Sequence, residues 1–370
     1  MNSKMETWKH QIENGERCRA VVPSPEGSAS EDRRTPRHPH RFSPFPRRLL
    51  FMDVVRFPYL SHDPDTRNPR VSFSLIESTL YYLQPLRQTP DSKEALLVKL
   101  EEPKPGKVRL MDTLSRRAIQ HLPKNFPKVL NTLDFRVREV GKTYGLRFFD
   151  VRGKPITRFE FKSILITKVI MFSKEGLALW RLGEKKWSLI DDGAEKSHFD
   201  DVIYYKGRFY AIDYIGRIVV IDADSLKATE LASPVHGSRG NHRHFVESFG
   251  ELFLVDNDIV SVVPDYPVHF EVFKFIEEEQ KWDWVSGIGD RVLFVDDDRT
   301  FSLSSTDFPG FKGNCVYFTE YCFCEEDDDR PGFDAGIFDL EQRIARPLSA
   351  FPGYSKIFWP PPAWLRPQRS

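Results

Sequence analysis

The chain has 370 residues, 54 basic and 54 acidic side chains, and 40% hydrophobic residues. This length suits two average domains or one large all-β domain, and a net charge of zero argues against a nucleic-acid binder, which usually carries a basic excess. No apolar run approaches the roughly 18 residues of a membrane span, and the first residues lack the apolar core of a signal peptide. The composition therefore predicts no membrane partner and no secretion.

Residues 1–48 differ from the rest of the chain. Residues 23–48 are rich in Pro, Ser, Arg and His and show almost no periodic hydrophobicity, which predicts a disordered tail. Its basic group consists of Arg33, Arg34, Arg37, Arg41, Arg47 and Arg48. Such a group serves either as a nuclear-import or nucleic-acid patch or as part of a solvated tail.

From about residue 49 onward, short apolar runs are broken by Gly, Pro, Asp and Asn. The clearest runs are residues 108–111, 201–205, 208–212, 217–222, 251–255, 270–275, 291–295 and 314–319. Each has the usual length of a strand, and amphipathic helices are scarce. Residues 94–100 fit either a short helix or a strand. The fold class is therefore all-β.

Three similar segments favour a propeller over a sandwich or a barrel. Residues 206–213, 249–256 and 289–296 each combine a Gly-containing turn with an apolar strand that ends in Asp. The final Asp residues are spaced by about one four-stranded blade of ~40–50 residues. We expect residues 49–365 to form a single β-propeller of about six or seven four-stranded blades, followed by a short tail at 366–370.

Aspartates recur where these strands end. Asp213, Asp256 and Asp296 close the three similar segments, and a second recurring element places Asp112, Asp222 and Asp339 after an apolar pair. A carboxylate at such a position accepts hydrogen bonds from the N–H groups of the following turn. We therefore interpret these aspartates as structural.

These segments together resemble the plant F-box proteins of the SKIP/KIB type, whose C-terminal region is a β-propeller. The resemblance covers most of residues 71–365. It is carried by residues 71–75, 114–115, 121–123, 125–130, 176–180, 187–192, 199–203, 205–213, 246–248, 284–287, 289–294, 302–304, 307–310, 313–318 and 354–365. The resemblance implies a protein-binding module that recognises the substrate of an SCF-type ubiquitin ligase. The client protein and the residues that bind it stay unknown.

Two departures from the family pattern affect this expectation. An intact F-box, the helical motif that docks on a Skp1-type adaptor and its cullin, is not recognisable, and residues 15–23 resemble only its last turn. The resemblance therefore leaves two readings open, a ligase receptor or an orphan propeller that competes with full-length relatives. Between residues 157 and 176 the chain is also shorter than the family pattern, which predicts one incomplete blade.

Motifs of catalysis or metal binding are weak. Residues 141–143 (Gly-Lys-Thr) lack the first glycine of a phosphate-binding loop, because Arg136 stands there. His236, His242 and His244 would suit a metal, but Arg239 and Arg243 between them oppose a cation, so we expect an exposed basic loop.

The four cysteines, Cys18, Cys315, Cys322 and Cys324, form no disulfide framework and lack the usual zinc spacing. They indicate reduced thiols in a cytoplasmic or nuclear protein. The acidic run 325–329 lacks the pattern of a calcium loop. We predict no enzyme, no cofactor and no metal; a propeller-based hydrolase is the alternative, and a cluster of polar groups with shifted pKa values at the channel mouth would favour it.

Overall fold

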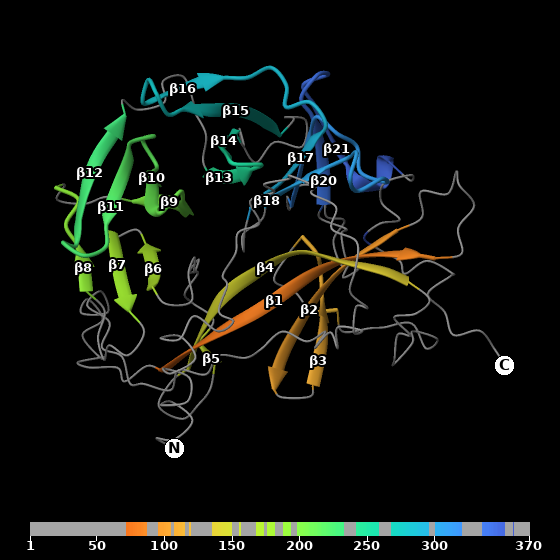
Figure 1. Cartoon of the computed structure of the whole chain (residues 1–370), viewed down its shortest axis with the longest axis horizontal. Coiled ribbons are helices and arrows are strands. Elements are labelled where there is room, and N and C mark those ends of the chain that lie inside the picture. Colours follow the sequence, from red (N-terminus) through yellow and green to blue (C-terminus); the bar gives the residue numbers. More distant parts are fainter. Residues whose placement is uncertain are drawn as a thin grey trace, which may run out of the picture. The chain divides into compact units, whose positions relative to one another are not determined.

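The computed structural model describes residues 72–86, 95–104, 107–114, 118–119, 135–149, 155–156, 168–173, 176–181, 188–193, 198–232, 242–258, 268–295, 300–319, 335–351 and 358. The predicted tails at 1–48 and 366–370 and the possible start of the propeller at 49–71 lie outside these residues. The described residues form strands almost throughout (Figure 1). Their one helical element is a 3₁₀ turn at Leu348–Ala350.

The strands form five sheets, which we number along the chain. Sheet 1 contains β1 (Ser72–Pro85), β2 (Leu96–Lys104), β3 (Lys107–Met111), β4 (Phe135–Phe149) and β5 (Pro155–Ile156), in the order β3-β2-β1-β4-β5. Sheet 2 contains β6 (Lys168–Ser173), β7 (Gly176–Arg181) and β8 (Ser188–Ile190), in chain order. The described residues give sheet 2 three strands. Most of the segment 157–176, on which the prediction of an incomplete blade rests, lies outside them, so that prediction stays untested.

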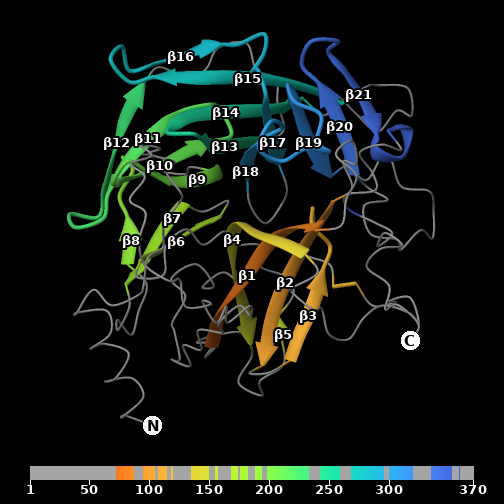
Figure 2. The ribbon, with the colours of Figure 1, turned by 45° about the vertical axis from the view of Figure 1, so that its right-hand side comes forward.

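Sheets 3 and 4 are regular four-stranded antiparallel meanders. Sheet 3 contains β9 (Phe199–Tyr205), β10 (Arg208–Asp213), β11 (Ile218–Asp222) and β12 (Lys227–Ala232). Sheet 4 contains β13 (His242–Ser248), β14 (Glu251–Asp258), β15 (His269–Ile276) and β16 (Lys281–Trp284), which run side by side in Figure 2.

Sheet 5 departs from this pattern. It contains β17 (Arg291–Val295), β18 (Phe301–Ser304), β19 (Cys315–Thr319), β20 (Ala335–Asp339) and β21 (Ile344–Pro347), in the order β18-β17-β19-β20-β21. Strands β17 and β19 pair in parallel, with Val292 opposite Cys315. The hairpin β17–β18 therefore adds a fifth strand at one edge of this sheet.

All eight strand predictions are confirmed, and residues 96–100 of the ambiguous segment belong to strand β2. The turns of two similar segments have the same geometry: Lys206 and Gly207 have φ of 44° and 85°, and Phe249 and Gly250 have φ of 51° and 78°. Two-residue hairpin turns with positive φ at both positions match the twist of the strands that they join. This local geometry explains why the segments look alike.

Four hydrophobic clusters each join two different sheets, and a smaller one, formed by Leu83, Leu96 and Val98, lies on sheet 1 alone. Separate clusters join sheet 2 to sheet 3, sheet 3 to sheet 4, sheet 4 to sheet 5, and sheet 5 back to sheet 1. In β10, Phe209 and Ala211 face sheet 2, whereas Tyr210 and Ile212 face sheet 4. Alternate side chains of a strand point to opposite faces, so a strand between two sheets is apolar at consecutive positions.

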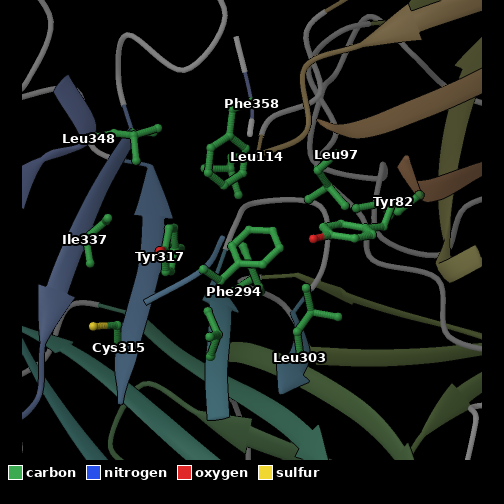
Figure 3. Packing of buried hydrophobic residues seen from close by; sticks show 14 of the residues in the cluster. Tyr82, Leu97, Leu114, Phe294, Leu303, Cys315, Tyr317, Ile337, Leu348 and Phe358 are labelled. Carbon is green, nitrogen blue, oxygen red and sulfur yellow. The ribbon is translucent and has the colours of Figure 1, made fainter. Parts of the chain in front are cut away.

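A further core joins the last sheet to the first. Tyr82 and Leu97 of sheet 1 pack with Phe294 and Tyr317 of sheet 5 and with Phe358 near the end of the chain (Figure 3). Sheets that pack face to face in chain order, with the last returning to the first, form a β-propeller. The predicted fold class is therefore confirmed, and the number of six or seven blades stays a prediction, since the described residues contain five sheets.

The aspartates at strand ends do accept hydrogen bonds from turns. Asp112 Oδ1 accepts from Leu114 N (2.9 Å), Asp222 Oδ1 from Asp224 N (2.9 Å) and Asp339 Oδ1 from Glu341 N (2.9 Å). The structural interpretation is confirmed for these three residues and for Asp213, described below. The prediction was wrong for Asp256, which lies within β14 and not at its end, with its carboxylate 3.7 Å from Arg243. Asp296 lies outside the described residues.

Candidate partner-contact site

The turn between β10 and β11, residues 214–217, presents two large apolar side chains to solvent; we call it the Tyr214 turn. Tyr214 is 57% exposed and Ile215 is 54% exposed. Gly216 has a φ of 86°, a conformation that glycine adopts without strain. Single exposed apolar residues are common, but these two are consecutive and lie on one tight turn.

The carboxylate of Asp213 holds the Tyr214 turn from inside sheet 3. Its Oδ1 accepts hydrogen bonds from Ile215 N (3.1 Å) and Arg217 N (2.9 Å), and its Oδ2 accepts from Arg217 Nε (2.9 Å). The backbone adds a bond from Gly216 N to Asp213 O (2.9 Å). Asp213 is only 2% exposed, so these bonds are shielded from water. The turn is consequently rigid although its tip is exposed.

Arg217 extends this support to residues next to sheet 2. Its Nη2 donates to Asp192 Oδ2 (2.7 Å) and its Nη1 to the Asp192 carbonyl (3.2 Å). Burial alone would lower the pKa of Arg217, but the hydrogen bonds to Asp213 and Asp192 raise it. The guanidinium therefore stays charged and keeps both carboxylates in place.

A second arginine reaches the Tyr214 turn from sheet 4. Arg243, in β13, is 2% exposed, and its Nη1 donates to the Tyr214 carbonyl (2.5 Å). Its guanidinium also lies 3.7 Å from Asp200 Oδ2 and 3.7 Å from Asp256 Oδ2. These carboxylates come from β9 and β14, so the turn rests on a charged cluster that spans the seam between sheets 3 and 4.

The carboxyl group of Asp200 has a raised pKa. Burial raises its pKa to about 7, the nearby Arg243 lowers it, and the charges of Asp201 and Asp213 raise it further. Its neighbour Asp201 links the two sheets directly, because Asp201 Oδ2 accepts a hydrogen bond from Phe245 N in β13 (2.9 Å). The seam is therefore held by polar contacts at this end.

The exposed tip has the chemistry of a protein-contact site. The ring of His198 lies 5.5 Å from the ring of Tyr214, and the Tyr214 N–H donates to the His198 carbonyl (2.8 Å). Tyrosine is enriched among the residues that contribute most to binding energy at protein interfaces. A contact residue held on a rigid turn loses little conformational entropy on binding. The described residues thus present an exposed aromatic and aliphatic tip on a turn that is held by hydrogen bonds.

The motifs considered for catalysis lie elsewhere. Gly141, Lys142 and Thr143 lie within β4, so they form a strand rather than a phosphate-binding loop. Cys315 is buried in β19, as expected for a core thiol, and burial raises its pKa to about 12. His236, Cys18, Cys322, Cys324, Arg239, the acidic run 325–329 and the basic tail lie outside the described residues.

The prediction of an exposed basic loop at 236–244 was wrong for its last three residues. His242, Arg243 and His244 belong to β13, and Arg243 is buried because Asp200 and Asp256 surround its charge. Sequence analysis missed Arg243 as a functional candidate. A local signal existed, since Arg243 alternates with Phe245 in the pattern of a strand whose inward positions are buried.

Neither a metal centre nor a membrane segment emerges from the described residues. Among them, no three His, Cys, Asp or Glu side chains gather as they would around a metal ion. The same residues include no helix of the length and apolarity that a membrane crossing requires.

Comparison with known proteins identifies close relatives. Residues 72–339 match the family model described as KIB1-4 beta-propeller. From Arabidopsis thaliana, F-box protein SKIP23 is 34% identical over 80% of this chain and 80% of its own, and F-box protein At2g17036 is 32% identical over 70% of each. Putative F-box protein At5g60060 is 30% identical over 81% of this chain and 84% of its own. Among solved structures, the one described as YCF48 bound to D1 peptide is 15% identical over 52% of this chain and 64% of its own. Its TM-score of 0.26 is too low to support a structural conclusion.

Proposed function

Because this chain belongs to the KIB1-4 β-propeller family, we propose that it binds a client protein as the substrate-recognition part of an SCF-type ubiquitin ligase. Its relatives are named F-box proteins, which supports a role in protein interaction. The observation that carries the proposal is the Tyr214 turn, where two consecutive apolar side chains stay exposed on a turn that is fixed by hydrogen bonds to the buried Asp213. We propose this turn as part of the client-binding surface.

The mechanism is proximity. The propeller holds the client, and an N-terminal F-box tethers the ligase through a Skp1-type adaptor and a cullin. We propose that residues 15–23, which resemble the last turn of an F-box, bind the adaptor weakly or not at all. In that case the chain competes with its relatives for the same clients. Its place of action in this proposal is the cytoplasm, the nucleus or both.

One observation supports the alternative that the chain is an enzyme. Asp200 has a pKa near 7, as a general acid or base would, and it belongs to a polar cluster at the strand ends. However, the carboxylates of Asp213 and Asp201 accept hydrogen bonds from backbone N–H groups, and Arg217 is held between two carboxylates. These groups are occupied in holding the turn and the seam, which favours a binding role without catalysis.

The first experiment is affinity purification of the tagged full chain from plant extract, with F-box protein SKIP23 as the control. The adaptor and cullin are quantified by mass spectrometry together with every other captured protein. Recovery of the adaptor with both baits supports a ligase receptor. Recovery with the control alone refutes the receptor role for this chain. The hypothesis that the chain competes with its relatives for clients would then remain.

The contact site is tested in the same assay with the double variant Tyr214→Ser, Ile215→Ser. Leu189→Ser is the matched control, because Leu189 is 50% exposed but lies on β8 of sheet 2. We expect the double variant to lose specific captured proteins that the wild type and Leu189→Ser retain, with unchanged adaptor recovery. Unchanged capture by the double variant would remove the Tyr214 turn from the proposed surface.

A further inference from the structure

Two different sheets determine the position of the Tyr214 turn. From sheet 3, Asp213 binds the amides of Ile215 and Arg217, which fixes the path of the turn. From sheet 4, Arg243 binds the carbonyl of Tyr214, the residue with the more exposed side chain. Through this hydrogen bond, a buried and charged side chain of sheet 4 contacts the tip of the turn. The orientation of the tip therefore depends on a residue outside its own sheet.

We propose that Arg243 is a positioning residue for partner binding: by bonding the Tyr214 carbonyl across the seam, it sets the exposed tip in its binding orientation. This inference rests on the proposed function of the Tyr214 turn. It implies that the contact surface is complete only when sheet 4 is docked against sheet 3.

The chemistry of arginine fits this role. Its planar guanidinium carries five N–H donors in a fixed geometry, so one side chain can serve several acceptors in different directions. Arg243 directs Nη1 at the Tyr214 carbonyl while Asp200 and Asp256 lie 3.7 Å from its nitrogens. A lysine at this place would keep the charge but offer a single point of attachment. The site therefore uses the shape of arginine as well as its charge.

A purely stabilising role explains Arg243 less well. A buried ion pair gains little net stability, because removing both charges from water costs about as much as their attraction returns. In some proteins such groups fix one particular arrangement of the structure. The charged groups that face Arg243 come from two sheets: Asp200 from β9 of sheet 3 and Asp256 from β14 of sheet 4. Together they hold the guanidinium at one position beneath the Tyr214 carbonyl.

The test measures the turn directly and needs no client. The full chain is labelled at its isoleucine Cδ1 methyl groups, and the Ile215 resonance is assigned with Ile215→Val. Amide hydrogen exchange is followed in parallel for residues 214–217 and for strands β10 and β13. Three variants are compared with the wild type: Arg243→Gln, Arg243→Lys and Arg291→Gln.

Arg291→Gln is the matched control. Arg291 also bridges two sheets, since its Nη2 donates to Glu251 Oε2 (2.6 Å) between sheets 5 and 4, but it makes no contact with the Tyr214 turn among the described interactions. We expect Arg243→Gln to shift or broaden the Ile215 methyl resonance and to speed exchange in the turn at least tenfold, clearly more than in β10 and β13. Arg243→Lys should restore part of both signals, and Arg291→Gln should leave both as in the wild type.

Two results would overturn the proposal. An Ile215 resonance and turn exchange that stay at wild-type values in Arg243→Gln would show that Arg243 does not set the turn. Exchange that rises equally in the turn, β10 and β13 would assign Arg243 to the stability of the seam alone. If the substitutions at Tyr214 and Ile215 leave protein capture unchanged, the proposed contact site fails, whereas the methyl and exchange data still decide what Arg243 does to the turn.

Discussion

Replacing Asp200 with Asn should change how the stability of the protein depends on pH. Burial is the main cause that raises the pKa of Asp200 from 3.8 to about 7. The folded state therefore binds a proton that the unfolded state releases between about pH 4 and pH 7. The free energy of unfolding falls as pH rises through this window, because the carboxyl group must then ionise in a buried place. Below the window the group is neutral in both states and contributes no such penalty.

The size of the effect follows from the two pKa values. The difference between 3.8 and about 7, at about 1.36 kcal/mol per pKa unit, corresponds to roughly 4 kcal/mol above pH 7. The Asp200 side chain is only 12% exposed, so solvent screens this penalty little. Asp200→Asn carries no charge at any pH. Relative to the wild type, it should therefore gain up to about 4 kcal/mol of unfolding free energy between pH 4 and pH 8.

The assay is urea unfolding followed by tryptophan fluorescence at several pH values from 4 to 8, for the wild type and Asp200→Asn. Taking the difference between the two proteins cancels all groups that titrate alike in both. Asp307→Asn is the control, because Asp307 is exposed and only its backbone carbonyl contacts sheet 1, through Arg138. A difference between wild type and Asp200→Asn that stays constant with pH would refute the assignment of a raised pKa to Asp200.

Three further predictions concern the core and the turns. Tyr82→Phe removes the hydroxyl that donates to the Pro309 carbonyl between sheets 1 and 5 and should cost ~1–3 kcal/mol in urea unfolding; no loss would mean that this contact does not hold the closure. Cys315, whose thiol is buried with a pKa of about 12, should resist iodoacetamide at pH 8 until the protein unfolds; mass spectrometry that finds native alkylation would contradict its burial. Gly250→Ala should cost ~1–2 kcal/mol, since Gly250 has a φ of +78° with nothing within 4 Å of an added Cβ, whereas Gly141→Ala in strand β4 should cost nothing; equal effects would refute the conformational explanation.

Local patterns in the sequence predicted the strands well. Strands such as β10 and β14 are apolar at consecutive positions because each lies between two sheets, and short apolar runs between turn residues reveal that directly. The aspartates at strand ends were also predictable, since Asp222 and Asp339 accept hydrogen bonds from amides only two or three residues away. Features that depend on residues close to one another in the sequence could therefore be predicted.

The candidate site was not predictable in the same way. Arg243 is surrounded by Asp200, Tyr214 and Asp256, which are brought together by the docking of two sheets and not by any sequence spacing. A histidine on either side made residues 242–244 look like part of a basic loop. The parallel pairing of β17 with β19 was missed for the same reason, because the sequence predicts strands but not which strands become neighbours.

The two seams of sheet 4 differ in a way that bears on function. Where β13 meets sheet 5, the hydroxyls of Thr300 and Ser302 donate to carbonyls of β13, and such neutral bonds cost little to bury. The ion pair at that seam, Arg291 with Glu251, involves β14 instead, and both of its side chains are partly exposed. At the seam with sheet 3, β13 meets buried carboxylates and its own Arg243, which is a far more costly arrangement. If β13 only had to pack against its neighbours, hydrogen bonds from hydroxyl groups would be sufficient on both of its sides. The charged contacts lie beneath the exposed Tyr214 turn, so we infer that the free-energy cost of burying them is linked to holding that turn for a partner.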